Sequence, residues 1–385
     1  MVKTLPQHLD PAIGPKRILA LDGGGIRGAL TLGYLAKLEN ILADKHPDIK
    51  NFRLCHYFDL IGGTSTGSII AAALAIGKPV SEITEKYFSL GEKIFGRKNE
   101  WWNVFEIKEA VRATYDAGPL EEGLSSMFHD YTLGDDQHIK TGLCIVAKRA
   151  DTNSVWPMIN HPQGKFFDSK DGDNKNILLK DAIRASAAAP TYFLPMTIKV
   201  RQDETGAFVD GGVSMANNPA LQLFMVATLN GFPFHWKKGA DEILLVSIGT
   251  GMTKLEELPE KIKKSNLLNW AKKLPDMFMQ DASWHNQVLL QWMSKSPTAE
   301  EIDSEIGDLS TDYLAPEPLL TYIRYNVTFT PGNLNKITGK QYSAKKIEDL
   351  SEMSNAKNCR ELYSIGEIAG NKEIHPSHFP EKFNL

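Results

Sequence analysis

The hydrophobic pattern of the first 80 residues alternates short apolar runs with longer stretches of helical periodicity. Residues 17–22 form an apolar run that ends in glycines, and residues 57–61 form a second run. Apolar residues then recur every three or four positions over 26–43, and an alanine-rich stretch follows the second run over 68–75. We therefore expect strand–turn–helix twice, which is typical of a mostly parallel sheet with helices on its faces.

The rest of the chain continues this alternation. Apolar runs predict further strands, at 140–148, 155–159, 207–210, 242–248 and 321–330. Helical spacing predicts further helices, at 80–94, 178–189, 219–229 and 254–296, with short helices in the tail. The sequence thus predicts an α/β fold of three layers, α/β/α, around a mostly parallel central sheet.

The chain shows no internal repeat and no Gly- or Ser-rich linker, so we expect a single domain. Residues 1–15 look like a loose N-terminal leader. Residues 16–251 hold the alternating elements and form the expected core. Residues 252–385 are expected to be an extension that packs on the same domain.

Composition excludes some functions. The 385 residues are 42% hydrophobic, and their net charge of -4 with no long basic block gives no electrostatic support for a nucleic-acid partner. Cys55, Cys144 and Cys359 are far apart and lack metal-ligand spacing, so we expect free thiols in a reducing compartment. The first residues lack a signal-peptide core, and the apolar run 69–76 is far shorter than the roughly 20 residues that span a bilayer. We expect a soluble, cytoplasmic protein with at most peripheral membrane contact.

The first candidate for chemistry is a G-x-S-x-G motif, with Ser65 between Gly63 and Gly67. It lies between an apolar run and the alanine-rich helix, which is the context of a nucleophile elbow with an exposed serine on a sharp turn. Free N–H groups and the dipole of the following helix would favour negative charge on the serine oxygen. A small-residue turn is the alternative interpretation, and the flanking strand and helix favour the functional one.

The second candidate is the glycine-rich segment 22–28, DGGGIRG, at the end of the first apolar run. Three consecutive glycines leave backbone N–H groups unshielded by side chains. An acyl-transfer enzyme needs such donors to stabilise a tetrahedral oxyanion. The segment therefore suits an oxyanion hole.

The same segment has a competing interpretation. Gly23, Gly25 and Gly28 also spell G-x-G-x-x-G between a strand and a helix, as in dinucleotide-binding oxidoreductases. That site needs an acidic residue about 20 positions later, at the end of the next strand. Asp44 and Asp48 instead precede the next apolar run. The dinucleotide alternative fits poorly and stays open at this point.

The third candidate is Asp210, which ends an apolar run and is followed by two glycines. Such a carboxylate lies at a sheet edge, where open α/β folds bind ligands. Within reach of the Ser65 hydroxyl it could take the serine proton, and desolvation by its apolar neighbours would raise its pKa. An Asp-Gly turn is the common alternative. A triad with His285 would have the right chain order, but His285 lies in a helical pattern, which favours a two-residue machinery.

These three motifs, in this order, resemble those of the patatin-like phospholipase family: DGGGxRG, GxSxG and Asp-Gly-Gly/Ala. The alanine-rich stretch 185–193, the Asn-Asn-Pro at 217–219 and the glycine-ended run 245–251 are similar as well. The resemblance covers residues 17–251 well and the tail loosely. It implies a patatin-like catalytic core over 16–251.

The resemblance also implies a reaction. Ser65 would attack the ester carbonyl of a phospholipid or another acyl lipid, with Asp210 as its base and an acyl-enzyme as the intermediate. No histidine, metal or cofactor is implied. Plant patatins carry a secretory signal that this chain lacks, so a bacterial or cytoplasmic member is the better match.

The resemblance assigns the glycine-rich loop in more detail. The N–H groups of Gly24 and Gly25, with Gly23 or Ile26 nearby, would form the oxyanion hole. Arg27 resembles the loop arginine of the family, and we expect it to anchor the loop rather than to catalyse.

Two aromatic segments are candidates for a lid or for lipid contact. Trp101, Trp102 and Phe105 lie next to a basic pair, and Trp side chains favour the membrane interface. The segments 267–270 and 277–279 place Leu, Trp, Met and Phe among lysines. Ordinary core packing is the alternative for both segments. The sequence leaves the oligomeric state open.

Overall fold

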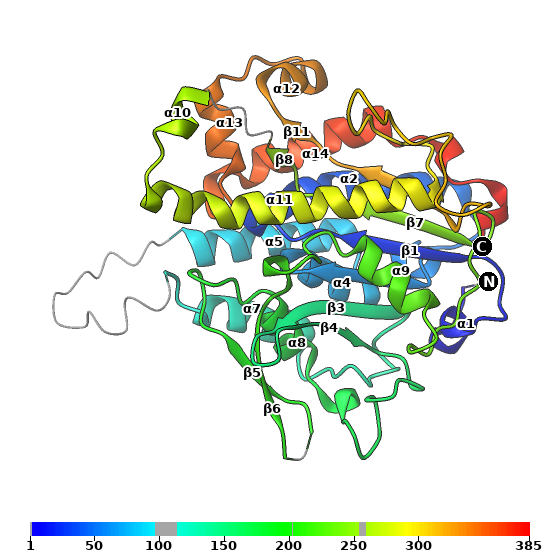
Figure 1. Cartoon of the computed structure of the whole chain (residues 1–385). Helices are drawn as coiled ribbons and strands as arrows, with labels where there is room; N and C mark the ends of the chain where they lie inside the picture. Colours follow the sequence, from blue (N-terminus) through cyan, green and yellow to red (C-terminus); the bar gives the residue numbers. More distant parts are fainter. Residues whose placement is uncertain (1, 97–113, 202, 254–258) are drawn as a thin grey trace.

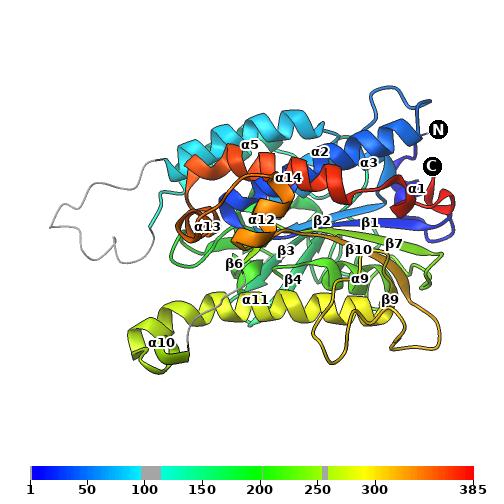
Figure 2. The same ribbon diagram turned by 90° about the horizontal axis from the view of Figure 1, so that it is seen from above.

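The structure is a computed structural model that describes residues 2–96, 114–201, 203–253 and 259–385. A twisted sheet lies between two helical layers (Figures 1 and 2). Along the sheet the strands are β5 (Met196–Lys199), β6 (Thr205–Asp210), β3 (Gly142–Arg149), β2 (Leu60–Thr64), β1 (Lys16–Leu21), β7 (Ile243–Ile248), β10 (Leu320–Tyr325) and β9 (Ser294–Lys295). A further strand, β4 (Ser154–Ile159), pairs with β3.

The central pairings, from β3 through β2, β1, β7 and β10 to β9, are all parallel. The pairings of β3 with β4 and β6, and of β5 with β6, are antiparallel. The prediction of a mostly parallel sheet is therefore confirmed. Its antiparallel margin, which the sequence did not predict, matters for the site because β6 carries Asp210.

The two faces of β1 divide the core. Leu19 and Leu21 belong to a hydrophobic cluster beneath α2 (Gly28–Lys45), α4 (Thr66–Ala75), α5 (Val80–Phe95) and α14 (Cys359–Glu373). Ile18 and Ala20 belong to a second cluster with α9 (Ala220–Thr228) and α11 (Leu267–Met293). Successive side chains of a strand point to opposite faces, so β1, whose residues 18–21 are apolar, is buried on both sides. Figure 2 shows α2, α5 and α14 on one side of the sheet and α11 on the other, which confirms the three-layer prediction.

Several element boundaries differ from the prediction. The expected strand at 57–61 begins later, because residues 54–57 form the short helix α3 (Leu54–Tyr57) and β2 starts at Leu60, opposite Ile18. Buried residues of a helix and of a strand are equally apolar, so the run alone could not place this boundary. The expected helix at 178–189 ends early, as α8 (Leu179–Ser186).

The part of the chain after residue 251 also differs in detail. The expected strand at 321–330 is two strands, β10 and the short β11 (Thr328–Phe329), which pairs with β8 (Met252–Thr253). Within the expected helix at 254–296, the described residues form two helices, α10 (Pro259–Lys263) and α11, and the short strand β9. Two further helices, α12 (Pro331–Thr338) and α13 (Ala344–Ser351), precede α14. Because β10 pairs with β7, this part of the chain contributes strands to the central sheet as well as covering helices.

The first residues are packed rather than loose. They include α1 (Leu5–Leu9), and Nδ1 of the buried His8 lies 2.8 Å from Oδ1 of Asp59. The guanidinium of Arg17 donates to both oxygens of the same carboxylate, from Nε at 2.9 Å and from Nη2 at 3.2 Å. Burial alone would raise the pKa of Asp59, but Arg17 and His8 hold that pKa below its usual range. Arg17 also donates to the carbonyl of Phe383, so this buried pair joins the two ends of the described chain, which lie together in Figure 1.

Two further expectations concern the cysteines and membrane-spanning helices. Cys55, Cys144 and Cys359 are buried free thiols, as expected. No described helix combines the length and the apolar character that crossing a bilayer would take.

Candidate active site

Ser65 lies on a tight turn between β2 and α4. Its backbone has φ 54° and ψ -126°, a strained conformation for a residue with a side chain. The turn brings the strand and the helix so close that a side chain on Gly63 would lie 2.2 Å from the carbonyl of Gly67. The expected nucleophile-elbow geometry is therefore present, and the chain needs glycine at 63 to form it.

The backbone of this turn is held from α8. The N–H of Ser65 donates to Oγ of Ser186 at 2.9 Å, and the Ser186 hydroxyl donates to the carbonyl of Val146 at 2.6 Å. Ser186 is fully buried between β3 and the turn. It thus ties Ser65 to the central sheet, and it uses the N–H of Ser65 in doing so.

Asp210 reaches Ser65 along an antiparallel strand. Asp210 pairs with Ala147 on β3, whose neighbour Val146 pairs with Thr64 on β2. The Ser65 side chain lies close enough to the carboxylate to lower the pKa of Asp210, and Oδ1 of Asp210 accepts the N–H of Gly212 at 2.7 Å. The structure therefore brings the two expected residues together. Asp210 lies at the end of β6, which runs antiparallel to β3 and so enters from beyond the carboxyl ends of the parallel strands.

The electrostatics suit a base. Asp210 is 5% exposed, and burial raises its pKa to about 6, while the nearby Ser65 side chain and the hydrogen bond from the N–H of Gly212 limit that rise. In the described part of the chain, none of the histidines hydrogen bonds to either residue, and His285 is exposed on α11. No described histidine therefore supports either residue through a hydrogen bond.

The glycine-rich loop after β1 lies against this pair. A Cβ atom on Gly23 would lie 3.1 Å from Cβ of Ser65. The N–H of Gly23 is already donated to the carbonyl of Asn217 at 3.0 Å, and the N–H of Ile26 to the carbonyl of Met353 at 2.8 Å. This corrects the wider set of expected donors, because an N–H engaged in the fold is not free to bind an oxyanion.

The N–H groups of Gly24 and Gly25 are the remaining candidate donors of the loop. Among the residues that the structure describes, no acceptor is recorded for either group. Gly25 has φ 57°, and a side chain there would lie 2.2 Å from the carbonyl of Met353. These two adjacent N–H groups follow Gly23, which lies against Ser65, and the positive φ of Gly25 favours glycine, so the loop suits an oxyanion hole.

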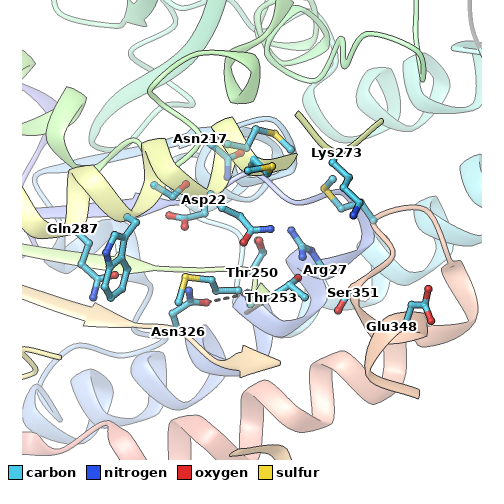
Figure 3. Close-up of a pocket in the computed structure, with 18 of the residues that line it drawn as sticks. Asp22, Arg27, Asn217, Thr250, Thr253, Lys273, Gln287, Asn326, Glu348 and Ser351 are labelled. Carbon is cyan, nitrogen blue, oxygen red and sulfur yellow. Dashed lines mark hydrogen bonds between the residues drawn. The ribbon is translucent and has the colours of Figure 1, made fainter. Parts of the chain in front are cut away.

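Arg27 points into a cavity on the other side of the loop (Figure 3). The cavity has a volume of about 630 Å³ and lies between the loop, α11 and the segment around Met353. Asp22 and Asn217 are part of its wall, whereas Ser65 and Asp210 are not. The cavity therefore adjoins the glycine-rich loop, and its wall does not include the Ser65–Asp210 pair.

The expected lipid-contact segments fall in different places. Trp101, Trp102 and Phe105 lie outside the described residues. Trp270, Met277 and Met279 line the cavity, and Phe278 is 67% exposed on α11. The side chains of residues 267 and 268 are also outside the described part. Of the second segment, only Phe278 is thus a described apolar side chain open to solvent.

Sequence reasoning missed three residues that build the site. Ser186 and Asn217 lie inside stretches that resemble the family, but nothing in their own pattern distinguished a bridging hydroxyl or a carbonyl acceptor. Arg324, on β10, forms a buried ion pair with Asp22 through Nη1 to Oδ1 at 2.9 Å and Nη2 to Oδ2 at 2.6 Å. A single arginine in an apolar run carries no signal for a partner 302 positions earlier.

Comparison with known proteins gives a consistent result. The model of the family described as "Patatin-like phospholipase" matches residues 19–224, more than half of the chain. The cGAMP-activated phospholipase of Escherichia coli (strain TW11681) is 34% identical over 235 residues, which cover 61% of this chain and 62% of that protein. The cGAMP-activated phospholipase of Vibrio cholerae is 35% identical over 218 residues, 53% of this chain and 56% of that protein. Patatin-like protein 2 of Oryza sativa subsp. indica is 28% identical over 380 residues, 93% of this chain and 84% of that protein.

Proposed function

The chain belongs to the patatin-like phospholipase family, and on that premise we propose that it is a serine hydrolase that cleaves fatty-acyl esters of membrane lipids. The observation that carries the proposal is that the Ser65 side chain lies next to a buried carboxylate, Asp210, whose pKa is raised to about 6. The match spans less than two thirds of the two bacterial relatives, so the activity rests on this geometry as well as on the likeness.

In the proposed reaction, Ser65 attacks the ester carbonyl while Asp210 accepts the hydroxyl proton. A carboxylate with a pKa near 6 is a better base than an exposed one and is still ionised at neutral pH. The product of this step is an acyl-enzyme on Ser65, with the alcohol half of the lipid released after protonation by Asp210. Asp210 then activates a water molecule that hydrolyses the acyl-enzyme.

The negative charge that develops on the carbonyl oxygen would be stabilised by the N–H groups of Gly24 and Gly25. These donors are fixed before the substrate arrives, so they cost little reorganisation during the reaction. The positive end of the helix dipole of α4, which begins at the next residue, would stabilise the alkoxide of Ser65.

The dinucleotide alternative loses its support. Family membership favours an ester hydrolase, and the carbonyl of Met353 occupies the space beside Gly25 that a pyrophosphate approaching the loop would need. The direct test is wild-type protein on a mixed phospholipid extract, with mass spectrometry of released fatty acids and lysolipids. Release that stops when a fluorophosphonate labels Ser65 supports the proposal. Absence of any released acyl chain would contradict it.

That assay needs one further arm. Two relatives are named as cGAMP-activated phospholipases, and a requirement for such an activator would make the protein alone look inactive. Each reaction is therefore run with and without cGAMP. Release of fatty acid only with cGAMP would support the hydrolase and add activation by this nucleotide, whereas inactivity in both arms counts against the hydrolase.

We predict that Ser186→Ala lowers kcat about tenfold. The variant leaves the buried N–H of Ser65 without an acceptor, which costs about 1–3 kcal/mol and loosens the strained turn. The measurement is kcat and KM on a soluble short-chain ester, together with the melting temperature. Ser186→Thr keeps the hydroxyl and serves as the matched control. A wild-type kcat for Ser186→Ala would show that the turn holds its shape unaided.

We propose that lipid approaches over an apolar rim beside Asp210. Val213 and Met215, which follow Asp210 in the chain, are 49% and 55% exposed. Exposed apolar side chains next to a buried carboxylate suit peripheral contact with acyl chains, since insertion removes their apolar surface from water. The cytoplasmic location stays a prediction.

The rim predicts a separation of two activities. The double variant Val213→Ser/Met215→Ser should hydrolyse vesicle lipids about tenfold more slowly, the effect of losing about 1.4 kcal/mol of membrane affinity. Its kcat/KM for a soluble short-chain ester should stay within about twofold of wild type, since the rim makes no contact with a small substrate. Leu314→Ser is the control, because Leu314 is an exposed apolar side chain at the other edge of the sheet. Its backbone N–H donates to the carbonyl of Trp292, close to β9. Equal loss on both substrates would contradict the rim.

A further inference from the structure

The ion pair between Asp22 and Arg324 lies directly at the base of the glycine-rich loop. Asp22 is the residue before Gly23, and both charged side chains are buried, 4% and 5% exposed. The guanidinium meets the carboxylate through two parallel hydrogen bonds, and its Nη1 also donates to Oγ of Ser247 on β7 at 2.7 Å. The first residue of the loop is thus fastened to β7 and β10 by a fork of fixed geometry.

The three glycines of the loop have no side chains with which to hold its shape. Three consecutive glycines have the widest conformational freedom of any segment, so their N–H directions depend on contacts from outside. Those contacts are few: besides the two N–H bonds to Asn217 and Met353, the carbonyl of Gly23 accepts the Thr250 hydroxyl at 2.9 Å and the carbonyl of Gly25 accepts the Tyr87 hydroxyl at 2.5 Å. The ion pair is the charged member of this set and sits at the point where the strand becomes the loop.

Stability alone is a poor reason for such a pair. Two charges buried together usually stabilise a fold no more than apolar residues of similar size would, because both must leave water. Nε of Arg324 is buried without a hydrogen-bond partner in the described structure, which adds to the cost. Unlike apolar packing, an arginine–carboxylate fork fixes the orientation of the carboxylate that it binds.

We propose that Arg324 is a positioning residue for the reaction, acting through Asp22 to aim the N–H groups of Gly24 and Gly25 at the developing oxyanion. This inference rests on the proposed hydrolase function. It places a determinant of the oxyanion hole on β10, 100 residues beyond the end of the region that matches the family, residues 19–224. The prediction is that weakening the fork slows the chemical step and leaves substrate binding unchanged.

The experiment compares Arg324→Lys with Arg17→Lys. Lysine keeps the charge but loses the fork in both, and Arg17–Asp59 is a second buried two-oxygen pair, at the opposite end of β1 from the loop. Both variants should lower the melting temperature. On a soluble short-chain ester, only Arg324→Lys should lose kcat, about 10- to 100-fold with KM within about twofold, as expected when donors are misplaced by a fraction of an ångström to 1 Å. Equal kcat in the two variants would overturn the proposal.

The double variant Asp22→Asn/Arg324→Gln separates positioning from stability. It removes both charges, so no unpaired charge remains buried and the melting temperature should recover toward wild type. Under the proposal kcat stays low although the protein is folded. Recovery of kcat together with stability would show that the pair only supports the fold.

A second measurement does not depend on turnover. Hydrogen exchange of the backbone amides in residues 22–30 should be faster in Arg324→Lys than in wild type, and unchanged in Arg17→Lys. If wild-type protein hydrolyses no ester, the proposed function fails, and this exchange measurement alone decides whether Arg324 holds the loop. Unchanged exchange in Arg324→Lys would overturn the inference whatever the activity.

Discussion

Asp210→Asn should lower kcat for ester hydrolysis about 10³-fold and, at the same time, make the protein harder to unfold at neutral pH. Asparagine is nearly isosteric and can still accept the N–H of Gly212, but it cannot accept the serine proton. General-base catalysis contributes about 10²–10⁴-fold in enzymes, so its loss is a large effect. Steady-state kinetics on a soluble ester measures it.

The opposite effect on stability follows from the pKa of Asp210. Burial raises that pKa from 3.8 to about 6, so the folded protein binds the proton more tightly than the unfolded chain does. The stabilising contribution of the proton is fully present below pH 3.8 and is lost as the pH rises through about 6. At pH 7.5 the ionised carboxylate therefore costs the fold about 3 kcal/mol relative to a neutral side chain.

Two pH series test both consequences of this carboxylate. The wild-type kcat/KM should fall as the pH drops through about 6, and Asp210→Asn should lack this dependence. The gap between the unfolding free energies of variant and wild type, measured by urea titration, should be small at pH 4 and widen toward pH 7.5. If the variant unfolded more easily than wild type at pH 7.5, Asp210 could not be the buried ionised base described here.

Ser65→Ala should abolish hydrolysis, with a fall in kcat of about 10⁵-fold. Without the hydroxyl no acyl-enzyme can form, and only the oxyanion donors remain to assist water. The free energy of unfolding should change little, because serine already has the strained positive φ that alanine would inherit.

The matched control is Ser68→Ala, three residues along the same turn. Ser68 is buried and its hydroxyl donates to the carbonyl of Ser65 at 2.6 Å, so it has the same chemistry but no path to substrate. Its kcat should stay within about tenfold of wild type, since it loses one hydrogen bond of the turn. Fluorophosphonate labelling, read by mass spectrometry, should vanish only in Ser65→Ala. Turnover by Ser65→Ala above 1% of wild type would remove Ser65 from the proposed mechanism.

The strand–turn–helix units could be predicted from sequence because their information is local. An apolar run, glycines and a helical repeat lie next to one another around Ser65 and around Gly23, and each specifies its own turn. The boundary of β2 was placed wrongly because Tyr57 and Phe58 are buried whether they lie on a helix or on a strand.

The details that decide which groups are free for chemistry are not local. Whether the N–H of Gly23 or of Gly24 is available depends on where the carbonyl of Asn217 lies, nearly 200 positions later. The fork from Arg324 to Asp22 depends on β10 pairing beside β7. Register between distant strands is set by the whole sheet, so a single sequence could suggest the loop but not its unpaired donors.

The order of the residues along the chain has a consequence for biosynthesis. Ser65 and Asp210 are both translated well before Arg324 and Met353, which hold the glycine-rich loop. At roughly 5–20 residues per second, the 143 residues between positions 210 and 353 take about 7 to 30 s to make. Under the proposed mechanism, a ribosome-bound chain therefore carries Ser65 and Asp210 for many seconds before the proposed oxyanion hole can form, which would delay ester cleavage until almost all of the described chain has emerged.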